Sequence, residues 1–131
     1  MLIRGLSSRA VDERPAVWVG HLVLPVNNID AAKAFWLALG MRHIETNEHV
    51  VVLELRGGTH LILLPETKTI PAGEVPFDLM VDDLEATHAE WDDLGLGPSE
   101  ITKGRIHASF TVRDPDGREL TVNSTHVVGI V

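Results

Sequence analysis

The side chains of this sequence that could do chemistry are histidines and carboxylates, because the chain has no cysteine. A thiolate nucleophile and a thiolate metal site are therefore excluded. Neither a Gly-x-Ser-x-Gly elbow nor a glycine-rich phosphate loop occurs. Asp78 stands out because it lies on an otherwise apolar stretch, FDLMV, where a buried carboxylate needs a partner. It could bind a cationic ligand group or act as a base, or it could pair with Arg105 or Arg113.

The overall charge narrows the possible partners. The 131 residues carry a formal net charge of −8, so the chain lacks the basic surface that nucleic acids or anionic membranes attract. No apolar run approaches the roughly 20 residues that span a bilayer, and residues 1–15 show no hydrophobic segment of a secretion signal. The absence of cysteine suits a reducing compartment. We therefore expect a cytoplasmic protein, with no nucleic acid and no membrane among its partners.

Each half of the chain predicts the same series of elements, namely a strand, a helix and three strands. In the first half the strands are predicted at residues 17–26, 41–45, 49–55 and 59–64, with the helix at 29–39. In the second half the strands are predicted at residues 77–81, 96–101, 105–112 and 119–123, with the helix at 84–94. Residues 1–15 are predicted to form an extension with a short edge strand at Leu2–Ile3, and residues 65–75 are predicted to form a linker.

The two halves are copies of one βαβββ unit. Their equivalent residues lie 55 positions apart, as in the pairs Asn28 and Asp83, Trp36 and Trp91, and Gly40 and Gly95. A helix covers only one face of such a unit, so two units are expected to pair and to enclose a shared cavity. We expect one α+β domain over residues 1–131, with a first module at 17–64 and a second at 76–126.

A tight turn, Asp114-Pro115-Asp116-Gly117, joins the last two strands. Together with the repeat, this turn resembles the vicinal oxygen chelate superfamily, which includes glyoxalase I, fosfomycin-resistance proteins, extradiol dioxygenases and bleomycin-resistance proteins. The other residues that carry the resemblance are HLVLPVNNIDA at 21–31, Leu39-Gly40, VDDLEA at 81–86 and Leu94-Gly95. The resemblance covers residues 17–124. It implies two tandem βαβββ modules that form a curved mixed sheet around a central cleft, and a homodimer.

Catalytic members of this superfamily hold one divalent metal with His and Glu ligands on the first and last strands of each module. The resemblance places these ligand positions at His21, Ile62, Pro76 and Thr121 in this sequence. Only His21 carries a strong metal donor, and a mononuclear site needs about three protein ligands. The usual metal site is therefore expected to be lost, and the chain is expected to have no cofactor.

A displaced metal site is the alternative. Side chains two residues apart on a strand share a face, so His60 and Glu119 could point into the same cavity as His21. The three would form a two-His, one-carboxylate set suited to Fe(II), Mn(II), Ni(II) or Zn(II). Otherwise His60 and Glu119 are solvated strand-end residues, and His21 hydrogen-bonds a ligand or Thr121.

Two functions follow from these alternatives. The first is a metal-free binding protein for a drug or metabolite, of the bleomycin-resistance type, with a cavity formed by His21, Asp78, His60, Glu119 and Thr121. The second is a metal-dependent lyase, isomerase or dioxygenase of the glyoxalase type that uses the displaced site. The three missing ligands favour the first function, and the acidic character of the chain favours a cationic ligand.

Overall fold

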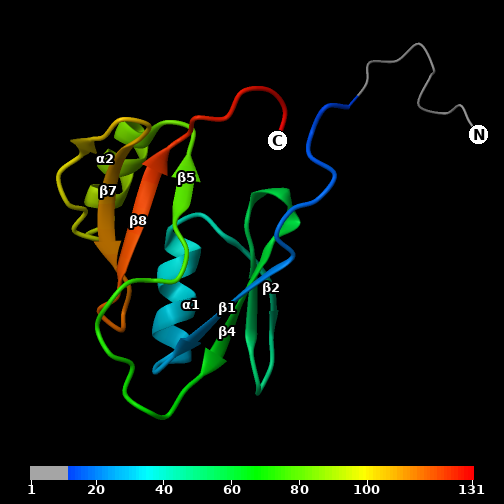
Figure 1. Cartoon of the computed structure of the whole chain (residues 1–131). Coiled ribbons are helices and arrows are strands. Elements are labelled where there is room, and N and C mark those ends of the chain that lie inside the picture. Colours follow the sequence, from blue (N-terminus) through cyan, green and yellow to red (C-terminus); the bar gives the residue numbers. More distant parts are fainter. Residues whose placement is uncertain (1–11) are drawn as a thin grey trace, which may run out of the picture.

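The computed structural model describes residues 12–131. Most of the predicted extension, including its edge strand at Leu2–Ile3, lies outside the described residues. The described chain forms two modules of the same architecture (Figure 1). Each module has one helix and one four-stranded sheet. The predicted α+β class and the pair of βαβββ units are confirmed.

The first module contains β1 (His21–Val26), α1 (Ile29–Ala38), β2 (Arg42–Thr46), β3 (Val51–Glu54) and β4 (His60–Pro65), with a 3-10 turn at Arg56–Gly58. The second contains β5 (Leu79–Val81), α2 (Leu84–Asp93), β6 (Thr102–Lys103), β7 (Ala108–Arg113) and β8 (Glu119–Ser124). The strand orders are β1-β4-β3-β2 and β5-β8-β7-β6. In each sheet the first strand runs parallel to the last, and the other neighbours are antiparallel.

Both helices begin with the same side-chain cap. The Asn28 and Asp83 side chains each accept a hydrogen bond of 3.0 Å from the backbone N–H three residues further on. Such a cap satisfies one of the N–H groups that the first turn of a helix leaves without a partner. Gly40 and Gly95 follow the helix ends with φ of 111° and 78°, which glycine adopts without steric cost. The residues that repeat in the sequence are therefore the ones that begin and end the helix in each module.

Alternation along the strands divides each sheet into a buried and an open face. In β1, Leu24 and Val26 are buried, whereas His21 and Val23 are exposed. The helices pack against the central strands of their own sheets, α1 against β3 and β4, and α2 against β7 and β8. The open face of each sheet is the one on which most of the polar candidates of the sequence lie.

The two modules share a single hydrophobic core. Trp36 of α1 is fully buried and lies 5.6 Å, ring to ring, from Phe77, which leads into β5. The linker is bound to the first module, because the Asn27 side chain donates hydrogen bonds of 2.8 Å to the carbonyls of Glu66 and Lys68. The modules are thus fixed to each other by packing and by the linker.

The differences from the predicted elements lie at strand ends. Residues 17–20 form no ladder, so β1 begins at His21. The predicted strand at 96–101 is absent; Gly97 there has a φ of 63°, and Pro98 has no N–H to donate. Only Thr102–Lys103 pairs, as β6, and β7 begins at Ala108. Neither helix of residues 12–131 is long and apolar enough to cross a membrane.

Candidate functional site

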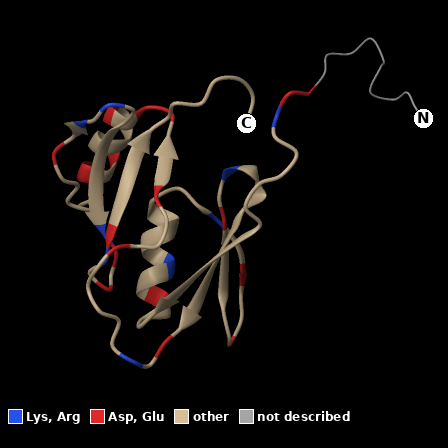
Figure 2. Cartoon of the chain, in the orientation of Figure 1, with Lys and Arg blue, Asp and Glu red and all other residues tan. Residues whose placement is uncertain are grey.

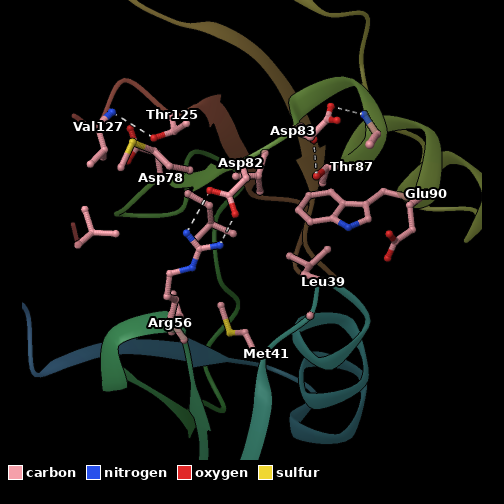
Figure 3. A pocket seen from close by; sticks show the side chains of 18 of the residues that line it. Leu39, Met41, Arg56, Asp78, Asp82, Asp83, Thr87, Glu90, Thr125 and Val127 are labelled. Carbon is pink, nitrogen blue, oxygen red and sulfur yellow. Dashed lines mark hydrogen bonds and ion pairs between the residues drawn. The ribbon is translucent and has the colours of Figure 1, made fainter. Parts of the chain in front are cut away.

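A cavity of about 850 Å³ opens where the two modules meet (Figure 3). We call it the seam cavity. It lies between the end of α1, the 3-10 turn, β5, the start of α2 and the C-terminal segment after β8. Its apolar lining comes from both modules and consists of Leu39, Met41, Leu55, Leu79, Met80, Val81, Ala86, Trp91, Val127 and Val131. A cavity of this size and composition is typical of small-molecule sites.

The polar lining of the seam cavity is mainly acidic. Four carboxylates, those of Asp78, Asp82, Asp83 and Glu90, face it together with one guanidinium, that of Arg56. Figure 2 shows the acidic residues of α2 and of the loop that leads into it. Part of the chain's negative charge therefore lies beside an apolar surface.

Two of the four carboxylates already have strong partners. Arg56 donates two hydrogen bonds to Asp82, of 3.2 and 2.6 Å, and joins the two modules by doing so (Figure 3). This guanidinium holds the pKa of the Asp82 carboxyl below its ordinary value. Asp83 caps α2. Within the described residues, Asp78 and Glu90 form no ion pair, and their charge is available to a ligand.

The structure places Asp78 in surroundings other than those that the sequence predicts. It is exposed rather than buried, and its Oδ2 accepts a hydrogen bond of 3.1 Å from the buried Asn123 amide. The predicted pairing with Arg105 or Arg113 is wrong, because Arg105 is exposed and Arg113 donates to the carbonyl of Gly117. The Asp78 carboxylate therefore lines the seam cavity, and its hydrogen-bond partner is a neutral amide.

The other predicted site residues lie on the two open sheet faces. His21 and His60 are paired across β1 and β4, and their ring centroids are 5.9 Å apart. Glu119 and Thr121 lie on β8 of the second sheet, where Thr121 pairs with Thr111. In residues 12–131 no three His, Asp or Glu side chains are close enough to hold a metal ion. The set of His21, His60 and Glu119 is therefore not brought together within the chain.

Sequence reasoning missed the partners of His60. Its Nε2 lies 2.9 Å from Glu54 Oε2, and Glu54 also accepts hydrogen bonds from Arg42. The bonds from Arg42 and, next, from His60 hold the pKa of the Glu54 carboxyl below its ordinary value. One signal could have found Glu54: it is a charged residue at the end of an apolar strand whose alternation places it on the open face.

The residues at the family's usual ligand positions do not fit a divalent metal. His21 has a donor atom, but Ile62 and Pro76 have none in their side chains, and Thr121 offers only a neutral hydroxyl. Ile62 pairs with Val23 in the sheet, two residues along from the pair of histidines. No reaction step through a metal at these four positions can be derived for this chain.

The family model of the "Glyoxalase/Bleomycin resistance protein/Dioxygenase superfamily" matches residues 18–122. The chain belongs to this superfamily. No curated protein sequence matches it significantly, so the comparison with relatives is structural.

Several solved structures share the fold. A lactoylglutathione lyase from Agrobacterium tumefaciens is 18% identical with a TM-score of 0.72, over 89% of this chain and all of that one. An antibiotic-binding protein from Streptomyces sp. CB03234 is 21% identical with a TM-score of 0.69, over 85% of this chain and 98% of that one. A bleomycin-binding protein, solved with bleomycin, is 17% identical with a TM-score of 0.66, over 85% and 100%. At these identities the likeness concerns the fold and leaves the activity open.

Proposed function

We propose that this chain is a metal-free small-molecule binding protein of the bleomycin-resistance type, and that its ligand is an apolar organic cation. The observation that carries the proposal is the seam cavity, whose lining combines four carboxylates and one guanidinium with an apolar surface. A cation bound there would gain the attraction of Asp78 and Glu90, while its apolar body would cover surface such as Met41 and Met80.

The superfamily supports the proposal in outline. Binding proteins for bleomycin and for another antibiotic share the fold, and three of the four usual metal-ligand positions, all except His21, lack a strong metal donor. The alternative is a metal-dependent enzyme of the glyoxalase or dioxygenase type. One observation favours it, the approach of His21 to His60, but a third ligand would have to come from outside the described chain.

A titration with two ions of the same shape tests the charge preference. Tetraphenylphosphonium and tetraphenylborate are nearly isosteric and differ in the sign of their charge. We expect calorimetry to show at least tenfold tighter binding of the cation, which corresponds to about 1.4 kcal/mol. Equal binding of both ions would mean that the carboxylates do not select the ligand.

Matched variants separate the seam cavity from the general negative charge of the chain. Asp78→Asn and Glu90→Gln should each weaken binding of the cation severalfold. Glu48→Gln removes the same charge from the exposed turn between β2 and β3, and should leave binding unchanged. Equal losses in all three variants would show that the net charge alone attracts the cation. Bleomycin, which is also cationic, serves as a second probe in the same titration.

We further propose that the chain forms a homodimer through the segment that enters β1. Val17, Trp18 and Val19 are 81%, 69% and 55% exposed, and a row of exposed apolar residues is typical of an interaction surface. Within the described residues β1 pairs only with β4, so its other edge is free to accept a second copy. The homodimer that the fold family suggests would cover this edge.

Trp18→Glu is expected to weaken the dimer. A central tryptophan in an interface contributes about 2 kcal/mol or more, so the dissociation constant should rise by about 30-fold. Light scattering after size exclusion, over a dilution series, measures this change. Ile106→Glu alters an equally exposed residue, 73% accessible in the loop before β7, and should not change the mass. A wild-type chain that is monomeric at all concentrations would contradict the proposal.

A further inference from the structure

Arg56 is the one basic residue that the described chain places in the lining of the seam cavity. It lies on the 3-10 turn between β3 and β4, whereas Asp82 lies between β5 and α2. The two terminal nitrogens of Arg56 donate to the two carboxylate oxygens of Asp82, at 3.2 and 2.6 Å (Figure 3). A planar cation that belongs to the protein itself therefore covers this carboxylate of the cavity.

This ion pair is well formed, but it can be exchanged at low cost. The side chains of Arg56 and Asp82 are 69% and 71% exposed, so water solvates both charges and the pair adds little to the stability of the fold. Asp82 has a short side chain and directly precedes Asp83, the N-cap residue of α2, which keeps its carboxylate at the cavity. The long arginine side chain has more rotatable bonds, so Arg56 is the partner that can turn away.

A second cavity, of about 620 Å³, gives the Arg56 side chain a place to go. Arg56 lines this cavity as well as the seam cavity. The other residues that line it include Asp12 and Trp18, and the tryptophan is 69% exposed. Guanidinium groups pair with carboxylates and stack on indole rings. When Arg56 leaves Asp82, it therefore still has favourable surroundings within reach.

We infer that Arg56 determines which cations the seam cavity accepts, and that the ligand carries a planar amidinium or guanidinium group that takes the place of Arg56 on Asp82. The inference rests on the proposed function, because it names the cationic group of the same ligand. A group with two parallel N–H donors restores both hydrogen bonds of the Asp82 carboxylate, and such charge-assisted pairs are strong and directional. A quaternary ammonium has no N–H to donate, so it cannot replace Arg56 and has to bind beside the intact ion pair.

The test compares two naphthyl cations of similar size, 2-naphthamidinium and (2-naphthyl)trimethylammonium, in NMR titrations of the full chain. We expect the wild type to bind the amidinium about fivefold more tightly than the ammonium. Arg56→Gln removes the competing guanidinium, and it should bind the amidinium about tenfold more tightly than the wild type does. Lys68→Gln removes the same charge from the exposed linker, and should bind as the wild type does. Unchanged or weaker binding by Arg56→Gln, or an equal gain in Lys68→Gln, would overturn the inference.

Asp82→Asn identifies the carboxylate that the amidinium reaches. This variant should lose the preference for the amidinium over the ammonium. Asp92→Asn alters an exposed carboxylate of α2 that does not line the seam cavity, and should keep the preference. A preference that survives Asp82→Asn would overturn the inference. Circular dichroism confirms that each variant is folded.

Spectra of the arginine Nε–H groups follow the displacement of Arg56 directly. The Arg56 resonance is the one that is missing from the spectrum of Arg56→Gln. It should shift when the amidinium binds and stay in place when the ammonium binds. If tetraphenylphosphonium binds but the wild type does not prefer the amidinium, this inference fails and the proposed function stands. If no organic cation binds at all, the proposed function fails together with the inference.

Discussion

Replacing Asp114 by alanine is expected to lower the free energy of unfolding by about 3–5 kcal/mol, because the buried guanidinium of Arg118 then keeps only its longer contact of 3.3 Å with Asp116. Asp114 and Arg118 are 5% and 7% exposed, and their side chains meet at 2.8 Å. The Asp114 carboxylate also accepts hydrogen bonds from the backbone N–H groups of Asp116 and Arg118. One side chain thus closes the turn and neutralises the guanidinium.

Two further variants identify which role of Asp114 matters. Asp114→Asn keeps an oxygen for the backbone N–H groups but loses the charge, so its cost should fall below that of alanine. Asp92→Ala removes an exposed carboxylate from α2 and should change stability by about 0.5 kcal/mol or less. Urea unfolding, followed by circular dichroism, measures all three. A cost for Asp114→Ala no larger than that for Asp92→Ala would contradict a structural role of the buried pair.

Trp36→Ala is expected to cost a similar amount, about 3–5 kcal/mol, the range for removing a buried tryptophan. Trp36 has no exposed surface, and it packs against Phe35 of its own helix and against Phe77 of the other module. Its loss opens a void at the contact between the modules. Because Phe77 immediately precedes Asp78, the seam cavity should be disturbed as well.

Trp36→Phe provides the matched control. The Nε1 of Trp36 is buried and has no hydrogen-bond partner among residues 12–131, so phenylalanine removes an unsatisfied donor while it keeps an aromatic ring. It should therefore cost less than alanine and preserve binding of the organic cation. If Trp36→Phe and Trp36→Ala destabilise the chain equally, the ring contact with Phe77 does not hold the modules together. Urea unfolding and the calorimetric titration are the two measurements.

The repeat made most of the fold predictable. Asn28 and Asp83 stand at the two helix starts, and a glycine follows each helix end, so local chemistry alone defined these boundaries. The ends of the strands were harder to predict, because a strand ends where its pairing partner ends. Residues 17–20 have strand composition but form no strand. Their carbonyls only accept single hydrogen bonds from the Thr59 hydroxyl and the His60 N–H.

The candidate sites depend on contacts between distant residues, which explains what the sequence could not predict. His21 and His60 were recognised as sharing a face, since alternation is local. Glu54 was missed as the partner of His60, since only the register of β3 against β4 brings them together. The seam cavity is lined by residues of both modules and of the C-terminal segment. No sequence motif predicts that Arg56 or Glu90 lies there. Their positions follow from the packing of one module on the other.

One measurement tests the central claim most directly, namely where the organic cation binds. Amide ¹H–¹⁵N spectra of the full chain would be recorded during a titration with tetraphenylphosphonium. We predict that the largest shifts occur at the seam cavity, around Met41, Met80 and Ala86, and that the open face around Val23 and Ile62 changes little. Saturable shifts confined to the open face, or no saturable shifts at all, would contradict the assignment of the seam cavity as the binding site.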